Sequence, residues 1–231
     1  MGGLLFYFSS RAQEVFYTIK YDLKSGQQPV DHISKLDDIL SDFKPISAQA
    51  LDSEYYAYTK YDESKYKKLI QGKELLQLER EDFFKFIVDD IRIHELITKD
   101  KFYRRTLRNK DVPYPWLINK KVLHKLHELI VALEREGYDS KAFVITNGHR
   151  HPRENERVGG ASQSRHMLGE AIDISIKDID KSGSYEDRDK QIVLKLLEEE
   201  IIKDEGGVGL YPGTRAVHFD VRGYRARWNS Y

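Results

Sequence analysis

The feature that most constrains the fold is the alternation of helical and strand-like segments after residue 119. Asn119 can cap a helix that runs to Gly137, because apolar residues recur every three or four positions between them. We predict a second helix at 187–203 and short strands at 143–146, 171–176, 208–211 and 216–221. Helices and short strands interspersed in this way indicate an α+β fold, in which a small antiparallel sheet carries flanking helices.

Two prolines, Pro113 and Pro115, mark a change in the character of the chain. Proline cannot sit inside a helix and biases the preceding residue towards an extended conformation. We therefore divide the chain into residues 1–112, a mainly helical N-terminal region of unknown role, and residues 113–231, a C-terminal catalytic unit. In the first region, helical spacing of apolar residues predicts helices at 30–43 and 81–97.

Composition excludes several classes of function. The 38 lysines and arginines balance 38 aspartates and glutamates, so the chain lacks the basic surplus that nucleic-acid binding usually requires. There is no cysteine, which excludes disulfides, thiolate zinc sites and cysteine nucleophiles. No apolar run reaches the roughly 20 residues of a membrane span. The short apolar start at 2–8 fits either the remnant of a removed signal or membrane anchor, or a first strand.

Candidate metal ligands gather in two segments of the C-terminal unit. In the first, His166 and Asp173 are seven residues apart, and the small residues between them allow close backbone approach. Asp173 lies on the strand predicted at 171–176, on the face opposite its isoleucines. In the second segment, His218 and Asp220 share one face of the last predicted strand.

Two imidazoles and one carboxylate suit zinc. Three protein ligands, His166, Asp173 and His218, leave one tetrahedral position for water, as a catalytic zinc site requires. A histidine on a strand is also often a hydrogen-bonded core residue, so spacing alone leaves both interpretations open.

At these residues the chain resembles the zinc peptidases of the D-Ala-D-Ala carboxypeptidase type. Their signature, Ser-x-His-x-x-Gly-x-Ala-x-Asp followed later by a histidine, is matched at every fixed position by Ser164, His166, Gly169, Ala171 and Asp173. Residues 145–150 look like the family's Ser-Gly-Tyr-Arg strand, and residues 207–212 and 217–220 look most like the branch that contains murein endopeptidase K. The resemblance covers about residues 113–228.

The resemblance implies a zinc-dependent enzyme that cuts peptide bonds in peptidoglycan, as an endopeptidase or a carboxypeptidase. Zn²⁺ would be bound by His166, Asp173 and His218. Arg150 aligns with an arginine that contacts the substrate or the developing oxyanion, and a salt bridge within its loop is the alternative. The substrate class places the protein outside the cytoplasmic membrane, in the periplasm or cell envelope. The oligomeric state is left open.

The general base is where this chain departs from the family. Several relatives carry a carboxylate three residues before the last zinc histidine, and here that position is Arg215. Asp220 is either the replacement base or a carboxylate that orients a ligand histidine. His149 occupies a position that is often tyrosine in relatives, which suggests a substrate or proton-transfer partner. The departure at Arg215 also supports an alternative function, a metal-binding module without activity, as in the similar hedgehog signalling domain.

Overall fold

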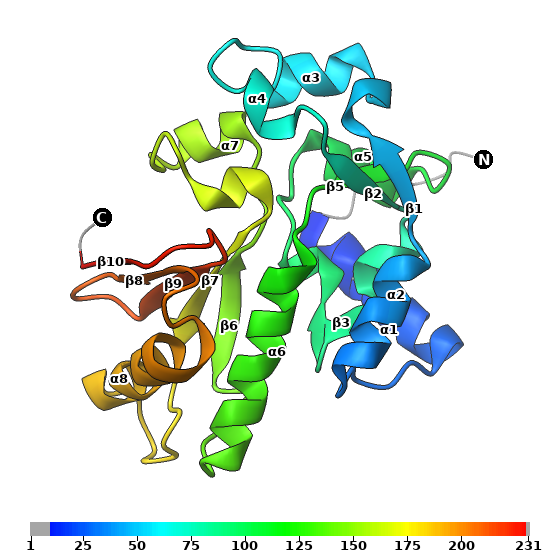
Figure 1. Cartoon of the computed structure of the whole chain (residues 1–231). Coiled ribbons are helices and arrows are strands. Elements are labelled where there is room, and N and C mark those ends of the chain that lie inside the picture. Colours follow the sequence, from blue (N-terminus) through cyan, green and yellow to red (C-terminus); the bar gives the residue numbers. More distant parts are fainter. Residues whose placement is uncertain (1–9, 230–231) are drawn as a thin grey trace.

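The computed structural model describes residues 10–229, in which a five-stranded sheet is bordered by helices (Figure 1). The strand order is β10-β8-β9-β7-β6. Neighbouring strands are antiparallel except β10 and β8, which run parallel. The bounds are β6 (Phe143–Asn147), β7 (Ala171–Ile176), β8 (Gly207–Leu210), β9 (Ala216–Asp220) and β10 (Ala226–Trp228).

Two of the helices in the C-terminal part, α6 (Lys120–Arg135) and α8 (Asp187–Leu196), pack against one face of this sheet (Figure 1). This part also contains α7 (Pro152–Arg157), a 3₁₀ helix η4 (Arg165–Leu168) and a π-helical turn η5 (Leu197–Ile201) that continues α8. The isoleucines of β7 are buried in the same core as the apolar side chains of α6 and α8. Asp173 and His218 alternate with the apolar core residues of their strands, so they lie on the face turned away from α6 and α8.

Local sequence explains α6 well. The Asn119 side chain accepts a hydrogen bond from the Lys121 backbone N–H, which caps the helix as predicted. Eight residues of the helix are buried at helical spacing, and Gly137 follows its end with a φ of +82°. The helix, the strands predicted at 143–146, 171–176, 208–211 and 216–221, and the α+β class are confirmed, with ends shifted by one residue or so.

The N-terminal part combines short helices with two small sheets. One sheet has the order β1-β2-β5 and the other is the hairpin β3-β4. The elements are α1 (Ser10–Ser25), α2 (Ile33–Ser41), β1 (Lys44–Ser47), η1 (Ala48–Ala50), α3 (Ser53–Thr59), α4 (Lys67–Ile70), β2 (Glu74–Leu78), η2 (Glu81–Phe84), β3 (Phe86–Val88), β4 (Ile91–Arg92), η3 (Ile93–Glu95), α5 (Lys101–Arg108) and β5 (Tyr114–Trp116). None of the helices in residues 10–229 has the length and hydropathy needed to cross a bilayer.

The helix predicted at 81–97 is wrong, because this segment forms η2, the β3-β4 hairpin and η3. Its apolar residues Phe83, Ile87 and Ile91 are buried as the helical spacing required, but the backbone reverses between the last two. Asp89 makes the turn with a φ of +50°, and its backbone exchanges hydrogen bonds with Val30. A distant pairing partner therefore overrides the helical pattern.

The domain division after residue 112 stays a prediction. β5 begins at Tyr114, just after that division, and pairs with β2, which lies before it. One continuous cluster of buried apolar residues includes members from both sides of the division. The two parts of the chain are thus packed together through a shared core.

Candidate metal centre

His166 lies on η4, just before β7, and is held by two backbone contacts. Its Nδ1 lies 2.7 Å from the carbonyl oxygen of Gly148, and its own carbonyl accepts the Arg150 backbone N–H. Gly169 ends η4 with a φ of +65°, and a Cβ there would lie 2.3 Å from the Leu117 carbonyl oxygen. Only glycine fits this close turn, and the turn directs the His166 side chain over the sheet.

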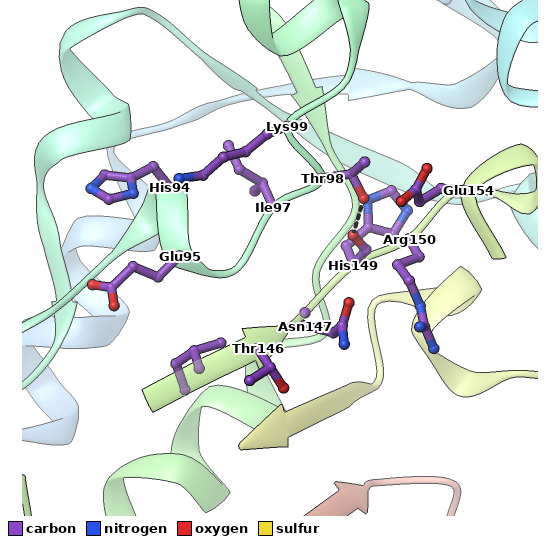
Figure 2. Close-up of a pocket in the computed structure, with 12 residues that line it drawn as sticks. His94, Glu95, Ile97, Thr98, Lys99, Thr146, Asn147, His149, Arg150 and Glu154 are labelled. Atoms are coloured by element: carbon purple, nitrogen blue, oxygen red, sulfur yellow. Dashed lines mark hydrogen bonds between the residues drawn. The ribbon is translucent and has the colours of Figure 1, made fainter. Parts of the chain in front are cut away.

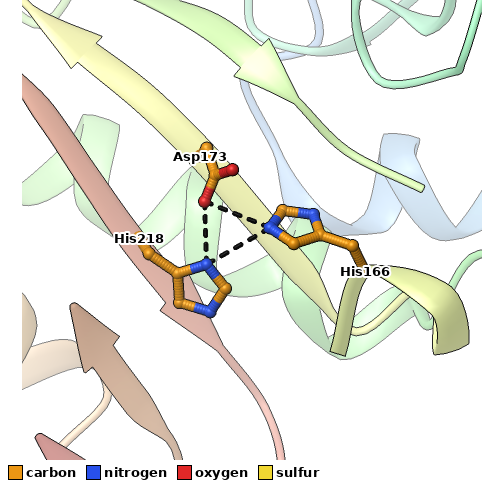
Figure 3. A group of neighbouring side chains, drawn as sticks. All are labelled: His166, Asp173 and His218. Carbon is orange, nitrogen blue, oxygen red and sulfur yellow. Dashed lines mark hydrogen bonds and ion pairs between the residues drawn. The ribbon is translucent and has the colours of Figure 1, made fainter. Parts of the chain in front are cut away.

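Asp173 and His218 face each other across two paired strands. They are register partners on β7 and β9, and the Asp173 Oδ1 lies 2.7 Å from the His218 Nδ1. The Nε2 of His166 lies 3.1 Å from the same carboxylate oxygen and 3.2 Å from the His218 Nδ1. Figure 3 shows the three side chains converging on one point. Asn147 on β6 donates to the second oxygen of Asp173, at 3.2 Å.

The donor set fits a cation. The Nδ1 of His166 faces a carbonyl and must carry its proton, so Nε2 presents a lone pair to the cluster. The Nε2 of His218 lies 3.0 Å from the Asp220 carboxylate, which assigns the proton to that nitrogen and the lone pair to Nδ1. Two nitrogen lone pairs and a carboxylate oxygen then point at one another. Zinc bonds of about 2.0–2.1 Å in tetrahedral geometry would separate such atoms by about 3.3 Å.

Electrostatics keep Asp173 ionised. Burial would raise its pKa, but the neighbouring histidines, His166 first, hold that pKa well below its usual range. Burial lowers the pKa of His166, and Asp173 offsets this only in part. Burial would also lower the pKa of His218, but its hydrogen bonds to Asp173 and Asp220 outweigh the effect and raise it. The cluster therefore holds one ionised carboxylate between two imidazoles. A divalent cation would bind this set with both rings neutral, in competition with protons.

Asp220 lies beneath the cluster and its carboxylate is fully engaged. It is completely buried, and its Oδ1 accepts the backbone N–H of Gly207 at 3.0 Å. Arg222 donates to both oxygens, from Nε at 2.8 Å to Oδ1 and from Nη2 at 2.6 Å to Oδ2. Burial would raise the pKa of Asp220, but Arg222 and His218 lower it. The sequence offered no signal for Gly207 or Arg222 as partners of this carboxylate.

Two glycines of β8 make room on the polar face of the sheet. Gly207 pairs in register with Asp220, and Gly209 pairs with His218. A Cβ at Gly209 would lie 2.6 Å from the ring of Trp228, which packs 5.1 Å from the His218 ring, centroid to centroid. The indole therefore packs against the His218 ring, which is 5% exposed.

Arg150 lines a pocket beside the cluster. The pocket has a volume of about 330 Å³ and is lined by residues from η3 and the following loop, from β6, and by Arg150 and Glu154 (Figure 2). The Nε of Arg150 is buried and has no hydrogen-bond partner in the described structure. A fixed cation with an unpaired donor at the edge of a pocket is suited to bind a carbonyl or carboxylate.

His149, which also lines the pocket, and His151 are both buried, and each is 1% exposed. Tyr61 donates its hydroxyl proton to the Met167 carbonyl at 2.9 Å and lies 3.2 Å from the His149 Nε2, which therefore donates to the tyrosine. Burial lowers the pKa of His149 to about 3. His151 contacts Asp100 at 3.1 Å and accepts the Glu154 backbone N–H, which caps α7. Tyr61 was not among the residues that the sequence singled out.

The structure also shows what takes the place of the missing carboxylate. The guanidinium of Arg215 stacks over the ring of Tyr185 at 4.4 Å, and its backbone carbonyl accepts the Ile176 N–H.

A second group of carboxylates, Asp178, Asp180 and Asp189, lies at the other end of β7. Oxygens of these aspartates accept backbone N–H groups of their own loop, and the group contains no histidine.

The fold and the centre together define an α+β protein with a candidate metal site on one face of its sheet. The Peptidase M15 family matches residues 91–220, which is more than half of the chain. The chain therefore belongs to the Peptidase M15 family, whose peptidases depend on zinc. Searches of curated proteins and of solved structures gave no match. The family resemblance is thus confirmed, while the particular branch and the ligand assignment stay predictions.

Proposed function

We propose that this protein hydrolyses peptide bonds in peptidoglycan, in stem peptides or cross-links, with a zinc ion bound by His166, Asp173 and His218. The observation that supports this best is the convergence of two nitrogen lone pairs and one carboxylate oxygen within 2.7–3.2 Å. Membership of the Peptidase M15 family supplies the peptidase chemistry. A zinc ion bound there would polarise the scissile carbonyl and lower the pKa of a bound water to near neutrality.

Arg150 is the residue we assign to substrate binding. It lines a pocket of about 330 Å³ and interacts electrostatically with Asp173, and its Nε has no partner within the described residues. A substrate carbonyl or terminal carboxylate bound by this fork would lie beside the metal ligands. Because arginine keeps its charge at all relevant pH values, it can stabilise an oxyanion without a proton transfer.

We assign Asp220 to positioning His218. A general base must reach the attacking water, whereas the Asp220 side chain is completely buried and both of its oxygens are occupied by hydrogen bonds. The carboxylate instead fixes the tautomer of His218, so that Nδ1 is free to bind metal. We likewise assign His149 to support rather than proton transfer, because its ring is buried and stays neutral down to pH about 3.

The substrate class implies a location outside the cytoplasmic membrane, in the periplasm or cell envelope, since stem peptides and cross-links are found there. An alternative function is a zinc-containing module that binds cell-wall peptides or a protein partner without cutting them. Two observations support this alternative. Arg215 stands where several relatives carry a carboxylate three residues before the last zinc histidine, and its guanidinium packs on Tyr185. The Asp220 carboxylate is already hydrogen-bonded to Arg222 and His218.

The test is incubation of the purified protein with defined muropeptides, with and without added zinc, followed by mass spectrometry of the products. We expect zinc-dependent cleavage that is lost in His166→Ala and Asp173→Asn. His124→Ala is the matched control, because this histidine on α6 contacts Asp37 and lies outside the cluster. Stoichiometric zinc binding without any cleavage would support the binding module. A protein that neither binds zinc nor cleaves would contradict both functions.

A further inference from the structure

One face of α1 exposes apolar side chains. Val15, Phe16, Ile19 and Leu23 have exposed fractions of 54%, 60%, 55% and 85%. They are four of the eight large apolar side chains exposed among residues 10–229, and the remaining four are distributed over other elements. Positions 15, 19 and 23 are one helical turn apart, so the side chains form a stripe, here called the apolar face of α1.

The opposite face of α1 fixes the helix to the rest of the protein. The ring of Tyr17 stacks on Phe84 at 6.0 Å, and the guanidinium of Arg80 lies 4.6 Å from the Tyr17 ring. Tyr21 donates to the side chain of Gln27 at 3.2 Å. Figure 1 shows α1 at the edge of the molecule, on the side opposite the strands that carry the metal site. The helix is thus anchored with its apolar face outward.

The acidic side chains of α1 form ion pairs with the rest of the protein, whereas its basic side chains do not within residues 10–229. Its two acidic residues are neutralised by the body of the protein, Glu14 by Lys99 at 2.6 Å and Asp22 by Arg92 at 3.0 Å. The three basic residues, Arg11, Lys20 and Lys24, are exposed, and within residues 10–229 none of them forms an ion pair. On a helix of 100° per residue, Arg11 borders the apolar face on one side and the two lysines on the other.

We propose that α1 lies in the interfacial layer of a membrane that contains anionic lipids. An apolar stripe flanked by unpaired cations is complementary to an acyl region bordered by negatively charged headgroups. Lys20 and Lys24 form part of the same shallow hollow as Phe16, Ile19 and Leu23, so charge and apolar contact would act at one place. Residues 1–9 precede the helix and contain Leu4 to Phe8 without a charged side chain, which extends the apolar sequence at this end of the chain.

The charge pattern favours a lipid surface over a second copy of the chain. In a two-fold dimer through this face, the cations of both helices would gather at the same contact, where like charges repel. Residues 1–9 are the other candidate occupant of the apolar face of α1, and the experiment below tests them. Lipid binding at α1 does not depend on the hydrolytic function proposed for the opposite side of the molecule.

The experiment is co-sedimentation of the full chain with vesicles of phosphatidylcholine alone or of a 3:1 mixture of phosphatidylcholine and phosphatidylglycerol. We expect binding to the anionic vesicles that weakens with salt. Leu23→Ser should reduce the partition coefficient about tenfold or more, because a leucine contact with the acyl region is lost. A double variant, Lys20→Gln with Lys24→Gln, should reduce it by a similar factor.

Val131→Ser on α6 is the matched control, since this side chain is 45% exposed but lies outside α1. Circular dichroism melting shows whether each variant keeps its fold. Wild-type binding to anionic vesicles that survives Leu23→Ser, or no binding at all, overturns the proposal. A lipid-free dimer dispersed by Leu23→Ser assigns the face to a second copy. An increase in the binding of a hydrophobic dye after deletion of residues 1–9 assigns the face to that segment.

Discussion

Replacing Asp220 by asparagine separates a positioning carboxylate from a general base. The carboxylate accepts hydrogen bonds at 2.6–3.2 Å from the Gly207 backbone, from His218 and from three nitrogens of Arg222. Asparagine has one acceptor oxygen, so its amide nitrogen must face a donor on one side. Where it faces His218, the proton of this histidine moves to Nδ1, the nitrogen that points at the other ligands.

A proton on Nδ1 competes directly with the metal. Loss of such an orienting carboxylate typically costs about 10- to 100-fold in metal affinity, which corresponds to about 1.4–2.7 kcal/mol. The metal-free protein should also lose about 1–3 kcal/mol of unfolding free energy, because a buried donor is left unsatisfied. The first value is measured by competition for zinc with a chromophoric chelator, and the second by urea denaturation.

Arg222→Gln is the matched control, because it removes the ion pair to Asp220 but leaves the contact between Asp220 and His218 intact. It should destabilise the protein while its zinc affinity stays within a few-fold of wild type. The reasoning is refuted if Asp220→Asn binds zinc with wild-type affinity and loses only turnover. In that case Asp220 transfers a proton in the reaction.

Three further predictions address other parts of the structure. Zinc at about 100 times its Kd should stabilise the protein by about 2.7 kcal/mol and raise Tm by about 5–10 °C in a thermal melt, and His166→Ala should abolish the rise. Burial lowers the pKa of His94 to about 4, below its unfolded value of about 6.5, so its contribution to stability is complete above pH 6.5 and is lost as pH falls towards 4. His94→Phe should therefore gain about 2 kcal/mol relative to wild type between pH 7 and pH 4.5 in urea denaturation, and a difference independent of pH would contradict this. Gly209→Ala should displace the Trp228 ring, shift tryptophan fluorescence to the red and cost about 1–3 kcal/mol; an unchanged spectrum would show that the strand adapts.

The sequence predicts those features whose causes are local. The cap at Asn119, the apolar stripe that follows it and the isoleucines of the strand at 171–176 each contain their own structural signal, and each was predicted correctly. The three candidate ligands were selected by residue type and spacing, and the register of β7 with β9 brings Asp173 and His218 together. Residue type therefore carried most of the information about the centre.

The features that sequence reasoning missed depend on distant partners. The segment at 81–97 has helical spacing, but a turn at Asp89 and its pairing with Val30 convert it into a hairpin. Asn147, Tyr61 and Arg222 support the centre through contacts that no local pattern reveals. Strand β10 is only three residues long and has too little alternation to be recognised.

The hydrogen bond from Tyr61 to the Met167 carbonyl has a consequence for how the centre assembles during folding. The two residues are 106 positions apart, whereas His166 and Gly148 are 18 apart, and Asp173 and His218 are 45 apart. Closing long loops is slower and entropically more costly than closing short ones. We therefore expect the ligand cluster to form from residues 148–218 first. Tyr61 then packs against His149 and the turn that carries His166. The last folding step is thus the one that restricts the motion of the cluster after its side chains have come together.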